Sequence, residues 1–312
     1  MPVKKIKSKP DLSVDFAGIK LKNPVLTASG TFGYGEEYGE FVDLNKLGGV
    51  IVKGVSLRPI KGNPSPRIWE TPSGMLNAIG LENPGVDMFI DKKMPYLRNF
   101  DTAVIVNIFG YSSEEYVGVA ERLDGVPGVS GLEVNISCPN VKAGGMAFGT
   151  DVKATYDLLS MVRKATKLPL IAKLSPNVTD VTEFARAARD AGCEGLSLIN
   201  TLLGMAIDIQ CRKPRLANGT GGLSGPAIRP VAIRMVWQTA KAVSLPIIGM
   251  GGIATGEDAL EFIMAGASAV AVGTANFVNP RATLDVVKGI ETFMHAQGVG
   301  TIRDLVGKVA IA

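Results

Sequence analysis

The sequence predicts a (β/α)8 barrel, and three observations support this fold class. Short apolar segments alternate with helical patterns eight times along the chain, which is typical of parallel strands joined by helical crossovers. The count of eight favours a closed barrel over an open doubly wound sheet, and no Gly-x-Gly-x-x-Gly motif follows the first strand. With 312 residues, 46% of them hydrophobic, one domain over residues 1–312 would use the whole chain, although length alone also allows two small domains.

The elements follow in a regular order after a hairpin expected within residues 12–21, around Ala17 and Gly18. The eight predicted strands have apolar centres; they span 24–30, 49–56, 102–110, 131–137, 168–175, 194–201, 245–252 and 268–275. The eight predicted helices span 36–47, 86–100, 113–123, 152–166, 181–191, 226–243, 256–265 and 281–297.

Three predicted loops, at 57–84, 139–150 and 202–225, exceed the usual length of roughly 2 to 6 residues for such connections. All three follow the carboxyl ends of strands. In a barrel these ends share one face, where active sites are built, so we expect the loops to cover a substrate. Insertions without a role would explain their length but not their common position.

Composition and charge limit the classes of function. A net charge of +4, from 33 basic and 29 acidic residues, is too small to indicate a nucleic-acid-binding protein. No apolar run reaches the roughly 20 residues of a membrane span, and the polar start lacks a signal-peptide core, so we expect a soluble, cytoplasmic protein. Three cysteines without Cys-x-x-Cys spacing indicate a reducing compartment and no zinc or iron-sulfur site in this chain.

Cys138 is the candidate catalytic residue. It ends a strand pattern in the stretch GLEVNISCPN, among polar and turn-forming neighbours. The chain has a single histidine, His295, so another group must carry protons, and a thiol with an unperturbed pKa of about 8.5 can do so when its thiolate is favoured. A buried, structural cysteine is the alternative; we favour it for Cys193 and Cys211.

Polar residues end the predicted strands where apolar or turn residues are expected. Unpaired burial of such groups costs several kcal/mol, so a bound ligand is the better explanation. Amides both donate and accept hydrogen bonds, which suits a flat heterocycle edged with C=O and N–H groups, and lysines suit an anionic substituent or an electron-rich ring. The residues are Ser29, Lys53, Asn107, Asn135, Lys173 and Asn200, with Asn77 in the first long loop.

Glycines after the last two strands form a separate signal. Gly251 and Gly252 follow the seventh strand, while Gly273 and Thr274 follow the eighth. Barrels commonly bind phosphate at these two loops, where glycines let backbone N–H groups approach closely. The pattern predicts a phosphorylated ligand, and flavin mononucleotide or a sugar phosphate fits better than a dinucleotide.

The chain resembles a known family in these and further segments: the class 1 dihydroorotate dehydrogenases, and within them the catalytic subunits of class 1B. The resemblance runs along nearly the whole chain. Its marks are TASGTFGYG (27–35), VKGVS (52–56), NPSPR (63–67), NAIGLENPG (77–85), NISCPN (135–140), AKLSPN (172–177), INT (199–201), ANGTGGLSGPAI (217–228), GMGGI (249–253) and VGTA (272–275).

The resemblance implies oxidation of dihydroorotate to orotate on FMN in pyrimidine biosynthesis. Cys138 would be the base that removes the C5 proton, while hydride passes from C6 to flavin N5. The substrate residues it implies are Lys53, Asn77, Ala78, Ile79, Gly80, Leu81, Asn135, Asn140, Asn200 and Thr201. The FMN residues are Ser29, Lys53, Gly54, Asn107, Asn135, Lys173 and Ile199, with the phosphate at Gly225, Gly251, Gly252, Gly273 and Thr274.

The class decides the electron acceptor. Cysteine at position 138, in place of the serine of the membrane-associated class 2 enzymes, resembles class 1. Class 1B members work with a partner subunit that carries FAD and a [2Fe-2S] cluster and reduces NAD, around a homodimer in a heterotetramer. This chain has neither a four-cysteine set nor an NAD motif, so it would need that partner.

Three alternatives stay open at this level. One is a class 1A enzyme, which uses fumarate and no partner. Another is a lyase that forms a Schiff base on Lys173. The third is a barrel that binds a ligand without catalysis.

Overall fold

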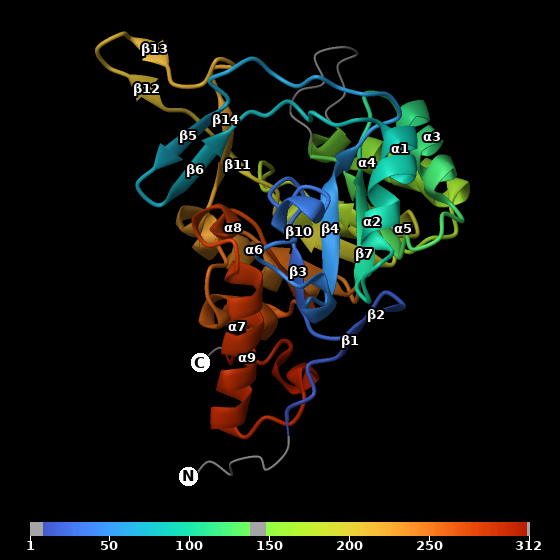
Figure 1. Ribbon diagram of the computed structural model, residues 1–312, viewed down its shortest axis with the longest axis vertical. Coiled ribbons are helices and arrows are strands. Elements are labelled where there is room, and N and C mark those ends of the chain that lie inside the picture. Colours follow the sequence, from blue (N-terminus) through green and yellow to red (C-terminus); the bar gives the residue numbers. More distant parts are fainter. Residues whose placement is uncertain (1–8, 138–147, 311–312) are drawn as a thin grey trace.

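The structure, a computed structural model, describes residues 9–137 and 148–310. Its centre is a closed barrel of parallel strands, which confirms the predicted fold class (Figure 1). The strand order around the barrel is β10-β15-β16-β3-β4-β7-β8-β9. Each strand lies within its predicted segment. The strands are β3 (Val25–Thr27), β4 (Gly49–Val55), β7 (Ala103–Ile108), β8 (Gly131–Asn135), β9 (Leu170–Lys173), β10 (Gly195–Leu198), β15 (Ile247–Met250) and β16 (Ala269–Val272).

Six of the eight predicted helices surround the barrel with bounds close to those expected. Side-chain caps begin four of them: Ser112, Asp151, Asp180 and Thr255 each accept a hydrogen bond from a backbone N–H of the first turn. Their apolar faces pack on the strands. The helices are α3 (Ser113–Leu123), α4 (Val152–Ala165), α5 (Val181–Asp190), α6 (Arg229–Ala242, after a 3-10 turn at Pro226–Ile228), α7 (Gly256–Ala265) and α9 (Ala282–Gln297).

The helix predicted over 36–47 is wrong. This segment forms two 3-10 turns, η1 (Glu36–Tyr38) and η2 (Leu44–Lys46). Gly39 between them is a poor helix former, and the Asp43 side chain binds the N–H of Asn45, which competes with continuous helical bonding.

The helix predicted over 86–100 is interrupted. It consists of α1 (Val86–Met88), a π-helical turn η3 (Phe89–Lys93) and α2 (Met94–Leu97). Pro95 lies in the first turn of α2 and has no N–H to continue an α-helical ladder. A further short helix, α8 (Ala275–Val278), was not predicted.

The predicted N-terminal hairpin is present and closes one end of the barrel. It consists of β1 (Val14–Phe16) and β2 (Ile19–Leu21), with Ala17 and Gly18 at positive φ in the turn. A Cβ added to Gly195 would lie 2.8 Å from the Phe16 ring, and one added to Gly131 would lie 2.9 Å from Ile19 Cδ1. The hairpin therefore packs against the first residues of β8 and β10.

The predicted loops 57–84 and 202–225 contain strands, which corrects the prediction; most of the third loop, 139–150, lies outside the described residues. The antiparallel strands β5 (Ile68–Thr71), β6 (Gly74–Asn77), β11 (Leu202–Gly204) and β14 (Gly221–Ser224) pair in the order β11-β14-β6-β5. We call them the cover sheet. A two-stranded tip, β12 (Ile207–Asp208) and β13 (Lys213–Pro214), extends beyond it (Figure 1). Asn77 of β6 and Gly222 of β14 pair although they are 145 positions apart, and such pairing cannot be predicted from either segment alone.

Among the helices in the described part of the chain, none is both long and apolar enough to cross a membrane.

Candidate active site

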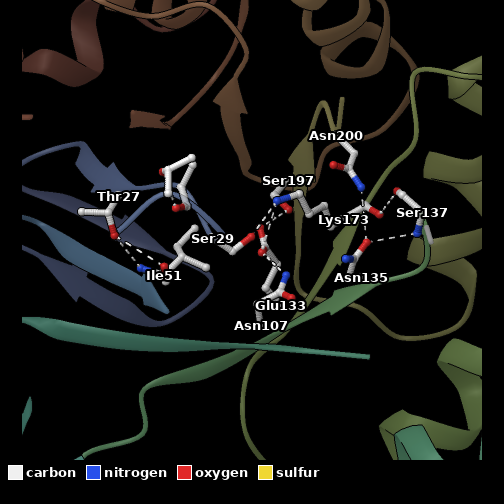
Figure 2. A network of polar contacts seen from close by, with 12 residues as sticks. Thr27, Ser29, Ile51, Asn107, Glu133, Asn135, Ser137, Lys173, Ser197 and Asn200 are labelled. Atoms are coloured by element: carbon white, nitrogen blue, oxygen red, sulfur yellow. Dashed lines mark hydrogen bonds and ion pairs between the residues drawn. The ribbon is translucent and has the colours of Figure 1, made fainter. Parts of the chain in front are cut away.

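A buried ion pair lies at the centre of the polar residues inside the barrel (Figure 2). Glu133 of β8 is fully buried, and its Oε2 lies 3.6 Å from Lys173 Nζ at the end of β9. Asn107 Nδ2 donates to Glu133 Oε2 at 2.5 Å, and Ser197 Oγ donates to Oε1 at 2.7 Å. Lys173 Nζ also donates to Ser29 Oγ at 2.9 Å. Four neighbouring strands and the end of β3 thus contribute to one network.

Strand geometry explains why these side chains meet. Successive side chains of a strand point to opposite faces, so Glu133 and Asn135 share the inner face of β8 while Leu132 and Val134 point to the helices. The parallel register pairs Asn107 with Glu133, and Asn135 with Lys173. The polar residues are therefore stacked in the carboxyl-terminal half of the barrel.

Asn135 connects this network to the rim. Its Oδ1 accepts from Ser137 N–H at 3.2 Å and lies 3.5 Å from Asn200 Nδ2, while its carbonyl accepts from Tyr116 Oη at 2.7 Å. On the neighbouring strands β4 and β7, a Cβ added to Gly54 would lie 2.9 Å from Asn107 Oδ1. Glycine at position 54 therefore leaves room for that amide.

The cover sheet brings a second group of predicted residues together. Asn77 Nδ2 donates to the carbonyl of Gly222 at 3.3 Å, and a Cβ added to Gly222 would lie 2.0 Å from Thr201 Oγ1. Thr201 follows Asn200 directly, and its N–H donates to Asn200 Oδ1 at 2.8 Å. The barrel amides and the cover sheet are thus continuous through residues 200–201.

The segment after Asn77 leaves donors available. Ala78 N–H donates to the carbonyl of Arg67 at 2.8 Å. Among the described residues, however, the N–H groups of Ile79, Gly80 and Leu81 have no hydrogen-bond partner. Gly80 and Leu81 both have positive φ, at 76° and 59°. Three consecutive half-buried N–H groups are suited to bind an anionic oxygen.

The predicted phosphate residues form a cradle at the loops after β14, β15 and β16. A Cβ added to Gly252, where φ is +82°, would lie 2.8 Å from the Gly225 carbonyl oxygen and 2.8 Å from Arg229 Cβ. Thr274 Oγ1 donates to Ser224 Oγ at 2.8 Å, which ties the third loop to the first. Arg229 is engaged by Asp258 and Glu261, so backbone groups and hydroxyls, not a free guanidinium, line this place.

The remaining predicted residues are placed as follows. Within the described residues, the Lys53 ammonium has no hydrogen bond or ion pair, while its backbone N–H donates to Gly33 at 2.9 Å. Ile199 N–H donates to Met250 at 3.0 Å. Cys138 and Asn140 lie outside the described residues.

Comparisons with known proteins give the relationship. The family model described as dihydroorotate dehydrogenase matches residues 11–294. The chain is 62% identical over 299 residues to a protein of Geotalea uraniireducens named dihydroorotate dehydrogenase B (NAD(+)), catalytic subunit, covering 96% of this chain and 98% of that protein. It is 59% identical to the protein of the same name from Geobacter metallireducens, over 97% and 99% of the two chains.

The chain belongs to the dihydroorotate dehydrogenase family. The fold agrees with a crystal structure of a DHODH from Eimeria tenella, determined in complex with ferulenol. That structure has a TM-score of 0.80 and 24% sequence identity, and the match covers 99% of this chain and 91% of the other.

For this dihydroorotate dehydrogenase, sequence reasoning missed two residues of the central network, Glu133 and Ser197. A signal for Glu133 was present, because it is the one charged residue in the strand GLEVN. Ser197 gave no signal, because serine is common in strands and at their ends. Hydrogen bonding across the barrel, which sequence alone does not show, connects the two.

The two other cysteines differ from each other. Cys193 is buried, as expected for a structural cysteine, and burial raises the pKa of its thiol to about 12. Cys211 is exposed at the tip beyond the cover sheet, so its assignment as a buried structural cysteine is wrong. The Asp208 carboxylate, which accepts from the Cys211 N–H at 3.0 Å, holds it in a turn that faces solvent.

Proposed function

We propose that this chain is the catalytic subunit of an NAD-linked dihydroorotate dehydrogenase, which oxidises dihydroorotate to orotate in pyrimidine biosynthesis. The observation that carries the proposal is the 62% identity, over nearly the full length of both chains, to a protein with that name. We further propose a single cytoplasmic barrel domain over residues 1–312. It would form the homodimeric core of a heterotetramer, with a partner subunit that carries FAD and [2Fe-2S].

The residues present fit FMN. The Gly225–Gly252 cradle has no room for a Cβ at position 252, so backbone N–H groups can approach a phosphate there. Lys173 supplies a buried ammonium, and Asn107 and Asn135 supply amides that can bind the edge of a ring. When bound, FMN supplies the acceptor for the hydride lost from C6 of the substrate.

The same constellation supports roles for the chain's own groups toward dihydroorotate. The N–H groups of residues 79–81 would bind its carboxylate, and Asn77, Asn135 and Asn200 would bind the C=O and N–H groups of its ring. Cys138 would accept the C5 proton as thiolate. The cover sheet, tied to the barrel at residues 200–201, would exclude water from this reaction.

The ion pair of Lys173 disfavours the Schiff-base alternative. An amine attacks a carbonyl only in its neutral form, whereas the Lys173 ammonium is held between Glu133 and Ser29. Borohydride trapping of a substrate on Lys173 would nevertheless overturn the dehydrogenase proposal.

The visible absorption spectrum of the purified chain tests the proposal. We expect a yellow protein whose flavin band bleaches when dihydroorotate is added without oxygen. A colourless preparation that does not respond to dihydroorotate would contradict the function. Copurification with an FAD and iron-sulfur subunit is expected for the NAD-linked class; rapid turnover of the chain alone with fumarate would contradict that class.

A further inference from the structure

Glu133 is a buried carboxylate to which the proposed reaction assigns no role. Neither substrate binding nor proton removal requires it, yet it lies inside the barrel, with its Oε2 3.6 Å from Lys173 Nζ (Figure 2). Burial of a carboxylate costs several kcal/mol unless charge and hydrogen bonds compensate. Its retention in a strand of otherwise uncharged residues therefore requires a physical reason.

Three strands hold this carboxylate in a fixed place. Asn107 from β7 and Ser197 from β10 donate to its two oxygens, at 2.5 and 2.7 Å, and these donors stand on opposite sides of it in the barrel. Because one carboxylate oxygen accepts from Asn107 and the other from Ser197, the carboxylate plane has little freedom to rotate. Glu133 is thus a rigid acceptor and not a flexible counterion.

The one cationic partner of Glu133 in the described residues is Lys173. Its Nζ lies 3.6 Å from Oε2 and donates to Ser29 Oγ at 2.9 Å, so the ammonium is held between the carboxylate and a hydroxyl across the barrel. A lysine side chain has several rotatable bonds and is otherwise a mobile point charge. Here its position is determined by the two acceptors.

We propose that Glu133 is a positioning residue that fixes the Lys173 ammonium and offsets part of its charge toward the FMN ring. The inference rests on the proposed function, because it assumes that FMN binds beside Lys173. A lone buried ammonium strongly stabilises negative charge on a neighbouring reduced flavin. An ammonium paired with a carboxylate acts as a dipole, whose field falls more steeply with distance. Glu133 would therefore keep the flavin potential low enough for electrons to leave toward an acceptor.

The decisive measurement is the midpoint potential of bound FMN in the full-length, FMN-loaded chain. Glu133→Gln keeps the shape of the side chain and removes its charge, so we expect a more positive potential than in the unaltered chain. Ser197→Ala, a milder change that frees one carboxylate oxygen, should shift the potential in the same direction by less. An unchanged potential in Glu133→Gln would overturn the proposal.

A second background tests whether Glu133 acts through Lys173. In Lys173→Met the carboxylate has no ammonium to hold in place, so adding Glu133→Gln should shift the potential by clearly less than it does when Lys173 is present. An equal positive shift in both backgrounds would contradict a role through Lys173. Glu194→Gln is the matched control, because Glu194 binds the Leu170 N–H at the other end of β9 at 2.8 Å. It tests whether disturbing that strand alone moves the potential.

The FMN-free chain separates this inference from the proposed function. We expect Glu133→Gln and Lys173→Met each to lower the melting temperature, and the double variant to lower it by clearly less than the sum of the two shifts. If the two melting-temperature shifts are coupled in this way but the chain does not bind added FMN, the proposed function is contradicted while the interaction between Glu133 and Lys173 is supported. Additive shifts would show that Glu133 does not hold Lys173.

Discussion

The two ends of the barrel are built from the same strands but are closed in opposite ways. At the amino-terminal end, Phe16 and Ile19 of the hairpin pack against Gly195 and Gly131. At the carboxyl-terminal end, a charged and amide-rich network fills the interior. Apolar closure needs only matching shape, whereas the polar network needs a partner for every group.

This difference separates stability from chemistry along each strand. Strand β8 begins with Gly131 against the hairpin and ends with Asn135 at the rim, only four positions later. A substitution at Gly131 should lower the stability of the fold and leave the reaction rate unchanged. A substitution at Asn135 should lower the reaction rate and leave the stability largely unchanged. The following predictions test this division, from the largest expected effect to the smallest.

Cys138→Ala should slow reduction of FMN by dihydroorotate by about 100- to 10,000-fold, the usual contribution of a general base. FMN binding should persist, because the phosphate cradle is elsewhere. Rapid-mixing absorbance at the flavin band measures the rate. Cys138→Ser should retain some activity with an optimum at higher pH, since a hydroxyl loses its proton less readily. The control is Cys211→Ser, at an exposed position, and full activity in Cys138→Ala would remove the proposed base.

Phe16→Ala should destabilise the fold by about 3 to 5 kcal/mol, because it empties a fully buried site at the amino-terminal end. Chemical denaturation of the FMN-loaded chain measures this. Phe41→Ala is the matched control: Phe41 is 48% exposed, and its loss should cost less than about 0.5 kcal/mol. A large fall in the turnover of folded Phe16→Ala protein would contradict the claim that the amino-terminal end of the barrel contributes to stability and not to the reaction.

Gly252→Ala should weaken FMN binding by about tenfold or more, equivalent to about 1.4 kcal/mol, because its Cβ would meet Gly225 and Arg229. Gly219→Ala is a close control. Gly219 has the same φ of +82° but no atom within 4 Å of an added Cβ, so it reports backbone strain alone. Fluorescence titration of the FMN-free chain gives the FMN dissociation constant of each variant. Equal dissociation constants for Gly252→Ala and Gly219→Ala would contradict phosphate binding at Gly252.

The sequence could predict the barrel because alternation and strand count are local patterns. All eight barrel strands lie within the predicted segments, and the hairpin turn followed from Ala17–Gly18. The cover sheet could not be predicted, because β6 and β14 pair across long sequence separations and each is short. The broken helix at 86–100 shows a different limit: Pro95 is visible in the sequence, but the π-helical turn before it depends on packing.

The site was predictable to the extent that its residues stand at strand ends. Lys173, Asn135 and Asn200 were named for that reason, and the structure places them together. Glu133 was missed because it sits one layer deeper, where a charge in a strand is normally unfavourable. Its partners Asn107 and Ser197 lie on other strands, and only the register of the barrel brings them to it.

The two remaining thiols offer a smaller, chemical test of the contrast between the ends. Cys193 lies just before β10 at the amino-terminal end, and burial raises the pKa of its thiol to about 12. The thiolate is the reactive form, so at pH 8 almost no Cys193 should react with a disulfide reagent. In Cys211→Ser we therefore expect one reactive thiol per folded chain, assigned to Cys138, and none after the further change Cys138→Ala. Labelling of Cys193 below pH 9 would show that the amino-terminal end opens to solvent, because only exposure would return its pKa to the ordinary range.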